Sequence, residues 1–144
     1  MSSPTQRTLA ELKRRGWTAQ VVEYWNVWAK RRVDLFSVID VVALIPNAWV
    51  GYPLTQSGIL AIQCCAGASH SARRAKILAE PRAAAWIEAG GRLELWSWAK
   101  QGARGKRKTW TLRVETYAEM RAERDAFLAS CVEVYRNSKP TETA

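Results

Sequence analysis

Two apolar segments rich in β-branched residues constrain the fold of this chain more than any other feature. They span residues 35–45 (LFSVIDVVALI) and 58–66 (GILAIQCCA). Both have the length and the flanking turn residues of buried strands, so the sequence predicts that they pair within a sheet. Each interior carries one strongly polar side chain, Asp40 in the first segment and Gln63 in the second. A buried carboxylate is costly unless it is paired, protonated or bound to a metal, so Asp40 requires an explanation.

The remaining chain alternates between helical and strand-like segments. Ser3 and Gln6 form a capping-box pattern around Pro4, and Thr116 and Glu119 form a second one. The predicted helices run from residue 4 to 15, from Ser69 or Ser71 to 79, from 82 to 89 and from 117 to 135. The predicted strands are 17–25, 35–45, 58–66, 92–98 and 108–115. Residues 26–34, 46–57 and 99–107 are predicted to be loops or turns.

This order, αβββαββα, predicts a single α/β domain with a mixed central sheet. The chain has 144 residues, of which 48% are hydrophobic, which suits one globular domain. We expect the domain to span residues 1–136 and the polar residues 137–144 to form a disordered tail. No apolar stretch approaches the roughly 20 residues that a membrane span requires, and the N-terminus lacks an apolar signal core. A cytoplasmic location is therefore expected.

The three cysteines do not indicate a disulfide or a zinc site. Cys64 and Cys65 are adjacent, so on a strand they point to opposite faces and cannot readily bridge. The chain has one histidine and no C-x-x-C pair. We expect reduced, buried thiols, and we interpret His70 as a helix-start residue rather than a general base.

The charge distribution favours a polyanionic partner. Lysine and arginine exceed aspartate and glutamate by 22 to 13, for a formal charge of +9, and the basic residues form four groups at 13–15, 30–32, 73–76 and 100–108. Nucleic acid is the first candidate, and an ordinary solvated basic surface is the alternative. The residues expected to contact DNA are Lys30, Arg31, Arg32, Lys100, Arg104, Lys106, Arg107 and Lys108.

Eight tryptophans can serve packing or binding. Trp96, Trp98 and Trp110 alternate along the last two predicted strands, where core packing is the better interpretation. The predicted loops hold Trp28 and Trp49, and Trp25 lies at the end of a predicted strand. These three lie near basic residues or turns, where they either pack locally or stack on unpaired bases.

The polar residues of the two apolar segments suggest a divalent metal site. Asp40 offers a carboxylate, Gln63 an amide oxygen and Glu11, on the first helix, a second carboxylate. Hard cations such as Mg²⁺ prefer oxygen ligands, and Mn²⁺ can substitute. Each residue has another interpretation: Asp40 can pair with an arginine, Gln63 can satisfy backbone groups and Glu11 can pair with a basic neighbour on its helix. Asp34 either anchors the Arg31–Arg32 turn or adds to the metal site.

This arrangement resembles the PD-(D/E)XK nuclease superfamily, which has the restriction-endonuclease-like fold, and it is most similar to the Holliday-junction-resolvase-like branch. The resemblance covers about residues 3–115. Asp40 matches the family aspartate on the second strand, and Glu11 matches the glutamate often found on the first helix. Gln63 falls at the acidic position of the (D/E)-x-K triplet, where some branches carry glutamine. The resemblance implies a Mg²⁺-dependent endonuclease that hydrolyses DNA phosphodiester bonds, including those of branched or structured DNA.

The sequence departs from the family pattern at the lysine of the triplet, which reads Gln63-Cys64-Cys65. In some branches the basic group comes from the following helix, where Lys76 is the first candidate and Arg73 the second. Either would orient the attacking water or neutralise charge on the phosphate. If these residues form only a solvated face, the chain is a catalytically degenerate nucleic-acid-binding module on the same fold.

Two further interpretations concern protein partners. Resolvase-like members of the family act on two strands, which is compatible with a homodimer, and the exposed face of the C-terminal helix is the candidate interface. A protein-interaction domain with a basic surface is the third functional class.

Overall fold

The computed structural model of the chain describes residues 2–46 and 58–138. Its helices are α1 (Pro4–Arg14), the short 3₁₀ helix η1 (Gly67–Ser69), α2 (His70–Ala79), α3 (Pro81–Glu88) and α4 (Tyr117–Ser138). Its strands are β1 (Thr18–Val21), β2 (Tyr24–Asn26), β3 (Arg31–Val33), β4 (Val41–Leu44), β5 (Ile59–Ala66), β6 (Arg92–Gln101) and β7 (Thr109–Thr116).

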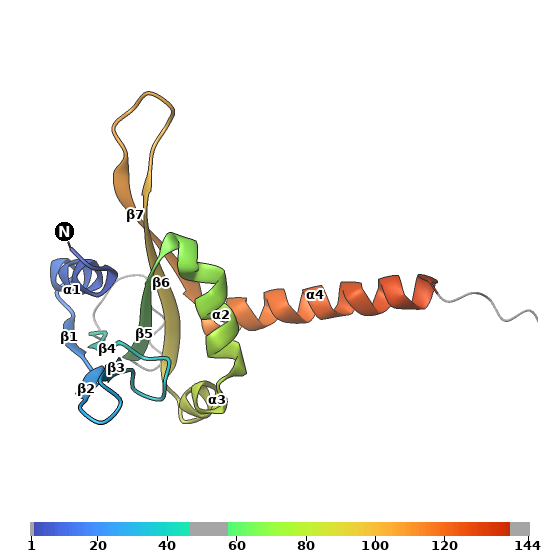
Figure 1. Cartoon of the computed structure of the whole chain (residues 1–144), viewed down its shortest axis with the longest axis horizontal. Helices are drawn as coiled ribbons and strands as arrows, with labels where there is room; N and C mark the ends of the chain where they lie inside the picture. Colours follow the sequence, from blue (N-terminus) through green and yellow to red (C-terminus); the bar gives the residue numbers. More distant parts are fainter. Residues whose placement is uncertain (1, 47–57, 139–144) are drawn as a thin grey trace, which may run out of the picture.

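A five-stranded mixed sheet forms the centre of the fold, with strand order β1-β4-β5-β6-β7 (Figure 1). The predicted pairing of the two apolar segments is confirmed, because β4 and β5 are antiparallel neighbours with Val41 opposite Ile62. β5 and β6 are parallel, and α2 and α3 connect them as parallel strands require. The prediction of a single α/β domain with a mixed sheet is therefore confirmed.

Helices cover both faces of the sheet, so β5 has six consecutive buried residues. α1 lies on one face, where Leu12 packs in a core with Leu60 and Ile62. α2 and α3 lie on the other, where Ile77 and Ala83 pack in a core with Ala61 and Cys65 (Figure 1). Successive residues of β5 therefore point alternately into the two cores. Gln63 alternates in step with Ala61 and Cys65, so it lies on the sheet face that α2 covers.

The chain between β1 and β4 differs from the prediction of one strand over 17–25 followed by a loop. The first strand ends at Val21, and a separate antiparallel hairpin follows, with Tyr24 opposite Val33. The Asn26 side chain explains the reversal: its Oδ1 accepts 3.0 Å hydrogen bonds from the backbone N–H groups of Trp28 and Ala29. Such a turn closes the hairpin locally, which the alternating pattern of 17–25 concealed. The predicted order αβββαββα is corrected by this insertion, whereas the predicted division of the following helical segment near residue 81 is confirmed by α2 and α3.

The first apolar segment is also only partly a strand. Residues 34–39 form a tight turn in which Phe36 and Ser37 have positive φ angles of 51° and 65°, and Ser37 N–H donates to the Asp34 carbonyl. Val38 and Ile39 are nevertheless fully buried. A continuous apolar segment shows burial but does not distinguish a strand from a buried turn. Asp40 therefore lies just before β4 and not inside it.

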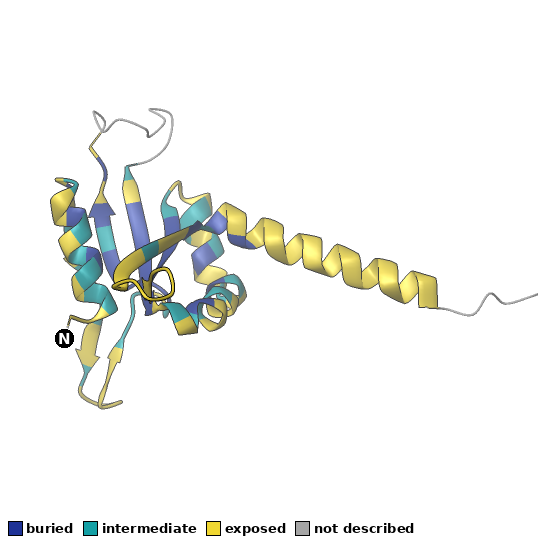
Figure 2. Ribbon diagram, turned by 90° about the horizontal axis from the view of Figure 1, so that it is seen from above, coloured by how far each residue is buried: buried dark blue, intermediate teal, exposed yellow. Residues whose placement is uncertain are grey.

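The last two strands and the last helix extend well beyond the sheet. β6 and β7 continue into a long hairpin, and α4 projects away from the body (Figure 1). The predicted Thr116–Glu119 capping box begins α4, with both hydrogen bonds at 3.2 Å. α4 is exposed along almost its whole length (Figure 2). It continues to Ser138, so the helix includes two residues of the predicted tail.

Other expectations have mixed outcomes. Trp96 and Trp98 are buried as predicted, whereas Trp110 is exposed and the Arg7 guanidinium lies 3.6 Å from its ring centroid. Cys131 is exposed rather than buried, because it lies on the projecting part of α4. The turn predicted at 46–57 lies outside the described residues except for Pro46, as do Trp49 within it and residues 139–144. No helix within residues 2–46 and 58–138 combines the length and apolar character that crossing a membrane would need.

Candidate metal centre

Three carboxylates gather at the end of the sheet where the β2–β3 hairpin leaves it. Glu23 precedes β2, Asp34 follows β3 and Asp40 precedes β4. One oxygen of each lies within 4.8 Å of the others. They line a cavity of about 280 Å³ together with Gln63 and Arg73. Oxygen donors from separate segments that converge on a cavity are a suitable ligand set for a divalent cation.

Gln63 joins this cluster from β5. Asp40 Oδ2 accepts a hydrogen bond of 2.6 Å from Gln63 Nε2 and another of 2.8 Å from the backbone N–H of Cys64. The Gln63 side chain is only 1% exposed, yet its Oε1 has no hydrogen-bond partner among the residues that the structure describes. A buried acceptor without a partner costs roughly 1–3 kcal/mol. A cation in the cavity would remove that cost, so the donor set fits a metal.

Burial and neighbouring charge make Asp40 a weak acid. The pKa of Asp40 is raised from 3.8 to about 7, chiefly by burial and also by the Asp34 carboxylate, against the lowering effect of the Cys64 N–H bond. Carboxylates that share a site disfavour one another's ionisation. A divalent cation would reverse this effect by attracting both carboxylates.

Basic side chains surround the carboxylates. Arg32 Nη1 donates to Glu23 Oε1 at 2.6 Å, and Lys76 Nζ lies 3.6 Å from Asp34 Oδ2. Arg73 lines the cavity from the first half of α2. The sequence predicted that Lys76 or Arg73 would approach the site from this helix, and the structure places both beside it.

Glu11 is not part of this cluster, and its predicted convergence with Asp40 and Gln63 is corrected. Its carboxylate pairs with Arg14 at 2.6 Å and with Arg15 at 3.0 Å on its own helix. The side chains of α1 pack on one face of the sheet, whereas Gln63 lies on the opposite face, which α2 covers. Of the residues of α1, only Pro4 and Thr5, at its start, line the cavity.

The other candidate residues take structural roles. Burial raises the pKa of the Cys64 thiol to about 12, and burial also raises that of Cys65, so neither is a ready nucleophile. His70 begins α2, as predicted, and lies in a buried network with Ser97 and Glu115, at 2.7 Å from each. That network does not line the acidic cavity.

Sequence reasoning missed Glu23 and gave Asp34 only a secondary role. Both depend on the hairpin that was interpreted as part of a strand and a loop. Asn26 was the available signal, because an asparagine side chain can accept hydrogen bonds from the backbone two and three residues later and so favours a turn. A hairpin centred there brings the residues just outside its strands, Glu23 and Asp34, to the same end of the sheet.

Comparison of the chain with protein-family models, curated proteins and solved structures gives no match. The function must therefore be inferred from the geometry of the chain itself.

Proposed function

We propose that this protein is a Mg²⁺-dependent endonuclease of the PD-(D/E)XK type that hydrolyses phosphodiester bonds in DNA. The observation that carries the proposal is the acidic cluster of Glu23, Asp34 and Asp40 beside the buried Oε1 of Gln63, which has no hydrogen-bond partner within residues 2–46 and 58–138. The element order α1-β1-β4-β5-α2-β6 supports it, since it corresponds to the αβββαβ core that the sequence resemblance implies.

The proposed ligands are Asp40, Gln63, Asp34 and Glu23. When bound there, Mg²⁺ would supply charge that polarises the phosphoryl group. Lys76 would release Asp34 to the cation and offer its ammonium group to the phosphate. Arg73, on the same helix, would neutralise the charge that develops on the phosphate oxygens. The missing triplet lysine is thereby replaced from α2, as some branches of the superfamily do.

The test uses the purified full chain with linear, nicked, single-stranded and branched DNA. Each substrate is incubated with Mg²⁺, with Mn²⁺ or with EDTA, and calorimetry measures metal binding separately. We expect cleavage with either metal and none with EDTA. DNA binding without metal-dependent cleavage of any substrate would instead identify a degenerate binding module. The absence of salt-sensitive DNA binding would favour a protein-interaction domain.

The β6–β7 hairpin is the proposed backbone-contacting arm. Its turn carries Arg104, Lys106, Arg107 and Lys108, all exposed, and it extends beyond the domain (Figure 1). Contacts of this kind hold phosphates without reading the base sequence. Lys30, Arg31 and Lys100 are exposed as well, whereas Arg32 is already paired with Glu23.

Replacing Lys106, Arg107 and Lys108 with alanine is expected to weaken DNA binding and reduce its salt dependence. Each lost phosphate contact removes about 0.9 from the slope of log affinity against log salt for duplex DNA, so the slope should fall by roughly 2–3. Fluorescence anisotropy across a salt series measures it. The matched control replaces Lys13, Arg14 and Arg121, which are exposed and lie outside the hairpin and the groove beside α4, and it removes the same charge. Equal loss in both triple variants would show a general charge effect rather than a phosphate-binding arm.

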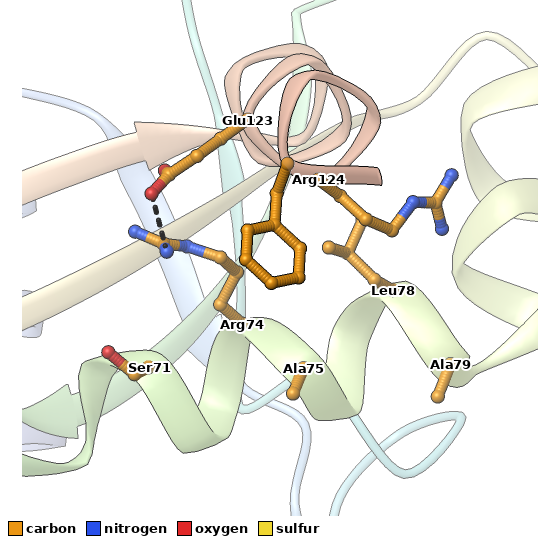
Figure 3. Close-up of a pocket in the computed structure, with 8 residues that line it drawn as sticks. Ser71, Arg74, Ala75, Leu78, Ala79, Glu123 and Arg124 are labelled. Atoms are coloured by element: carbon orange, nitrogen blue, oxygen red, sulfur yellow. Dashed lines mark hydrogen bonds and ion pairs between the residues drawn. The ribbon is translucent and has the colours of Figure 1, made fainter. Parts of the chain in front are cut away.

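We also propose that α4 mediates a homodimer. Residues 126–135 contain a single charged residue, Glu133, and their apolar side chains surround the helix. Such a helix is normally buried. Beside it, α2 and the start of α4 form a groove of about 560 Å³, lined by Ala75, Leu78 and Phe127 among others (Figure 3).

The exposed apolar side chains of α4 can supply more than half of a stable interface. Phe127, Leu128, Val132, Val134 and Tyr135 are each 48–69% exposed. If each side chain buries on the order of 100 Å² of surface, the five together supply about 500 of the roughly 800 Å² that a stable interface buries per partner. Two copies related by a twofold axis would each place this helix end against the other's groove.

The variant Leu128→Asp is expected to convert the dimer into a monomer, because a dimer would bury the new charge without a partner. Sedimentation equilibrium over a range of concentrations measures this. Ser130→Asp is the control: it adds the same charge to the same helix at a position that is already polar. A wild-type chain that is monomeric at high concentration, or a dimer that persists in Leu128→Asp, would contradict the proposed interface.

A further inference from the structure

The β2–β3 hairpin exposes large aromatic side chains that a folded domain would ordinarily bury. Trp28 is 93% exposed, Trp25 59% and Tyr24 56%, whereas Trp96 is completely buried in the same molecule. Exposed aromatic side chains that are gathered on one short segment often mark a binding surface, whereas single ones scattered over a protein do not. The hairpin is therefore a candidate binding element, distinct from the basic β6–β7 hairpin.

The hairpin presents Trp28 on an ordered turn. Asn26 Oδ1 accepts hydrogen bonds from the N–H groups of Trp28 and Ala29, and Lys30 completes the reversal with a φ of 51°. Register pairs between Trp25 and Arg32 and between Asn26 and Arg31 hold the two strands. A pre-organised aromatic loses little conformational freedom when it binds a ligand.

The two ends of the hairpin lead directly into the acidic cavity. Glu23 is the residue before β2, and Asp34 is the residue after β3. With a rise of about 3.3 Å per strand residue, the hairpin tip lies within roughly 10–20 Å of these carboxylates. A few nucleotides span that distance, so one polymer can reach the cavity and Trp28 together.

The charge of the hairpin favours an anionic ligand. Lys30 and Arg31 are exposed beside the aromatic side chains, and Arg32 lies at the base, where it pairs with Glu23. Cationic groups next to flat aromatic faces suit a polymer that has both phosphates and planar bases. Bases within a duplex are already stacked on their neighbours, so only an unpaired base can offer its face to Trp28.

We propose that the β2–β3 hairpin stacks Trp28 against an unpaired nucleobase and thereby selects DNA with single-stranded or branched segments near the phosphate held at the acidic cavity. This substrate preference rests on the proposed nuclease function, but the stacking itself can be measured without metal. Lys30 and Arg31 contact the neighbouring phosphates, and Trp25 extends the aromatic surface along β2.

The experiment measures binding in EDTA by anisotropy, with an oligothymidylate, a blunt duplex and the same duplex carrying an unpaired bulge. Trp28→Ala should weaken binding to the single strand and the bulged duplex by about 5- to 150-fold, the loss expected for one stacked base. Binding to the blunt duplex should be unchanged. Trp28→Phe should restore most of the loss, because phenylalanine retains an aromatic face.

Val27→Ala is the matched control, since Val27 is 66% exposed on the same turn and has no aromatic face. Equal binding by wild type and Trp28→Ala, equal losses with Val27→Ala, or no binding of single strands by wild type would overturn the inference. A loss of binding to anionic lipid vesicles in Trp28→Ala, with DNA binding unchanged, would overturn it in favour of a membrane surface. The nuclease proposal fails separately, through the absence of metal-dependent cleavage in a wild type that still shows the Trp28 effect.

Discussion

Asp40→Asn is expected to reduce metal-dependent DNA cleavage by at least about 100-fold, within the range by which loss of one preorganised electrostatic group reduces catalysis. The carboxylate of Asp40 is the member of the cluster that contacts both Gln63 and the Cys64 backbone, so it positions the Gln63 side chain. Asparagine keeps the shape and one acceptor oxygen but removes the negative charge that a cation requires. Metal affinity, measured by calorimetry, should fall with the cleavage rate.

The same substitution should preserve the fold. Asparagine Oδ1 can accept the two hydrogen bonds that now reach Asp40 Oδ2, and the neutral side chain is easier to bury than a carboxylate. The metal-free variant at pH 8 is therefore expected to be at least as stable as the wild type. A strongly destabilised Asp40→Asn would show that Asp40 has a structural role instead.

The raised pKa of Asp40 predicts a pH dependence with a definite sign. In the unfolded chain the carboxyl group ionises near pH 3.8, whereas in the folded protein its pKa is about 7. The metal-free protein should lose stability as pH rises through this window, by at most about 1.4 kcal/mol per pH unit from this group, and no further above it. Asp40→Asn should remove the contribution of Asp40 to that slope in denaturant titrations. Glu94, whose pKa is also raised by burial, contributes to the slope in both proteins.

Metal binding should show the complementary pH dependence. A cation competes with the proton on Asp40, so metal affinity should weaken as pH falls below about 7, by up to about tenfold per unit for one proton. Glu94→Gln is the matched control, because Glu94 is also a buried carboxylate of the sheet, bonded to Trp96 and outside the acidic cavity. Full cleavage by Asp40→Asn, or an equal loss in Glu94→Gln, would refute the assignment.

The central sheet could be predicted because its strands carry their own signals. The apolar segment 58–66 and the alternating segments near residues 92 and 109 correspond to β5, β6 and β7. The capping residues Ser3 and Thr116 correctly located the starts of α1 and α4. These features depend on neighbouring residues, so local patterns are sufficient to identify them.

The candidate site was only partly predictable because it depends on tertiary placement. Asp40 and Gln63 were identified by their polarity within apolar segments, and Lys76 and Arg73 by their helix. The sequence could not distinguish Glu11 from Glu23, since both are carboxylates in amphipathic segments. Glu23 reaches the cavity and Glu11 does not, because α1 covers the other face of the sheet and because Asn26 closes the β2–β3 hairpin. The hydrophobic periodicity of the sequence shows neither of these arrangements.

Glu115→Ala is expected to lower the free energy of unfolding by about 3–5 kcal/mol, the usual cost of breaking a buried charged pair by removing one partner. Glu115 on β7 accepts hydrogen bonds of 2.7 Å from His70 Nε2 and 2.8 Å from Arg74 Nη2. In the neutral imidazole, a proton on Nε2 that is donated to Glu115 leaves Nδ1 of His70 to accept from the Ser97 hydroxyl at 2.7 Å. Alanine would remove the carboxylate that accepts the hydrogen bonds of His70 and Arg74.

Glu123→Ala provides a matched control for this loss. Glu123 on α4 also pairs with Arg74, at 3.1 Å, but its side chain is 61% exposed. An exposed ion pair contributes between zero and about 1 kcal/mol, so this variant should change little. Urea denaturation of both variants at neutral pH measures the difference. Equal effects of the two substitutions would show that burial of Glu115 does not determine its contribution.

Glu115 and Asp40 should also be separable by pH, because their pKa values shift in opposite directions. Burial acts to raise the pKa of Glu115, but the hydrogen bonds from Arg74 and His70 outweigh it and hold the pKa below 4.5. Its contribution to stability is therefore present above its unfolded pKa and is lost as pH falls through the folded value. Glu115→Ala should reduce the loss of stability in acid, whereas Asp40→Asn should reduce the loss between about pH 4 and pH 7. If either variant changed both pH regions equally, the two carboxylates would belong to one coupled network, and the separate roles assigned to them would be wrong.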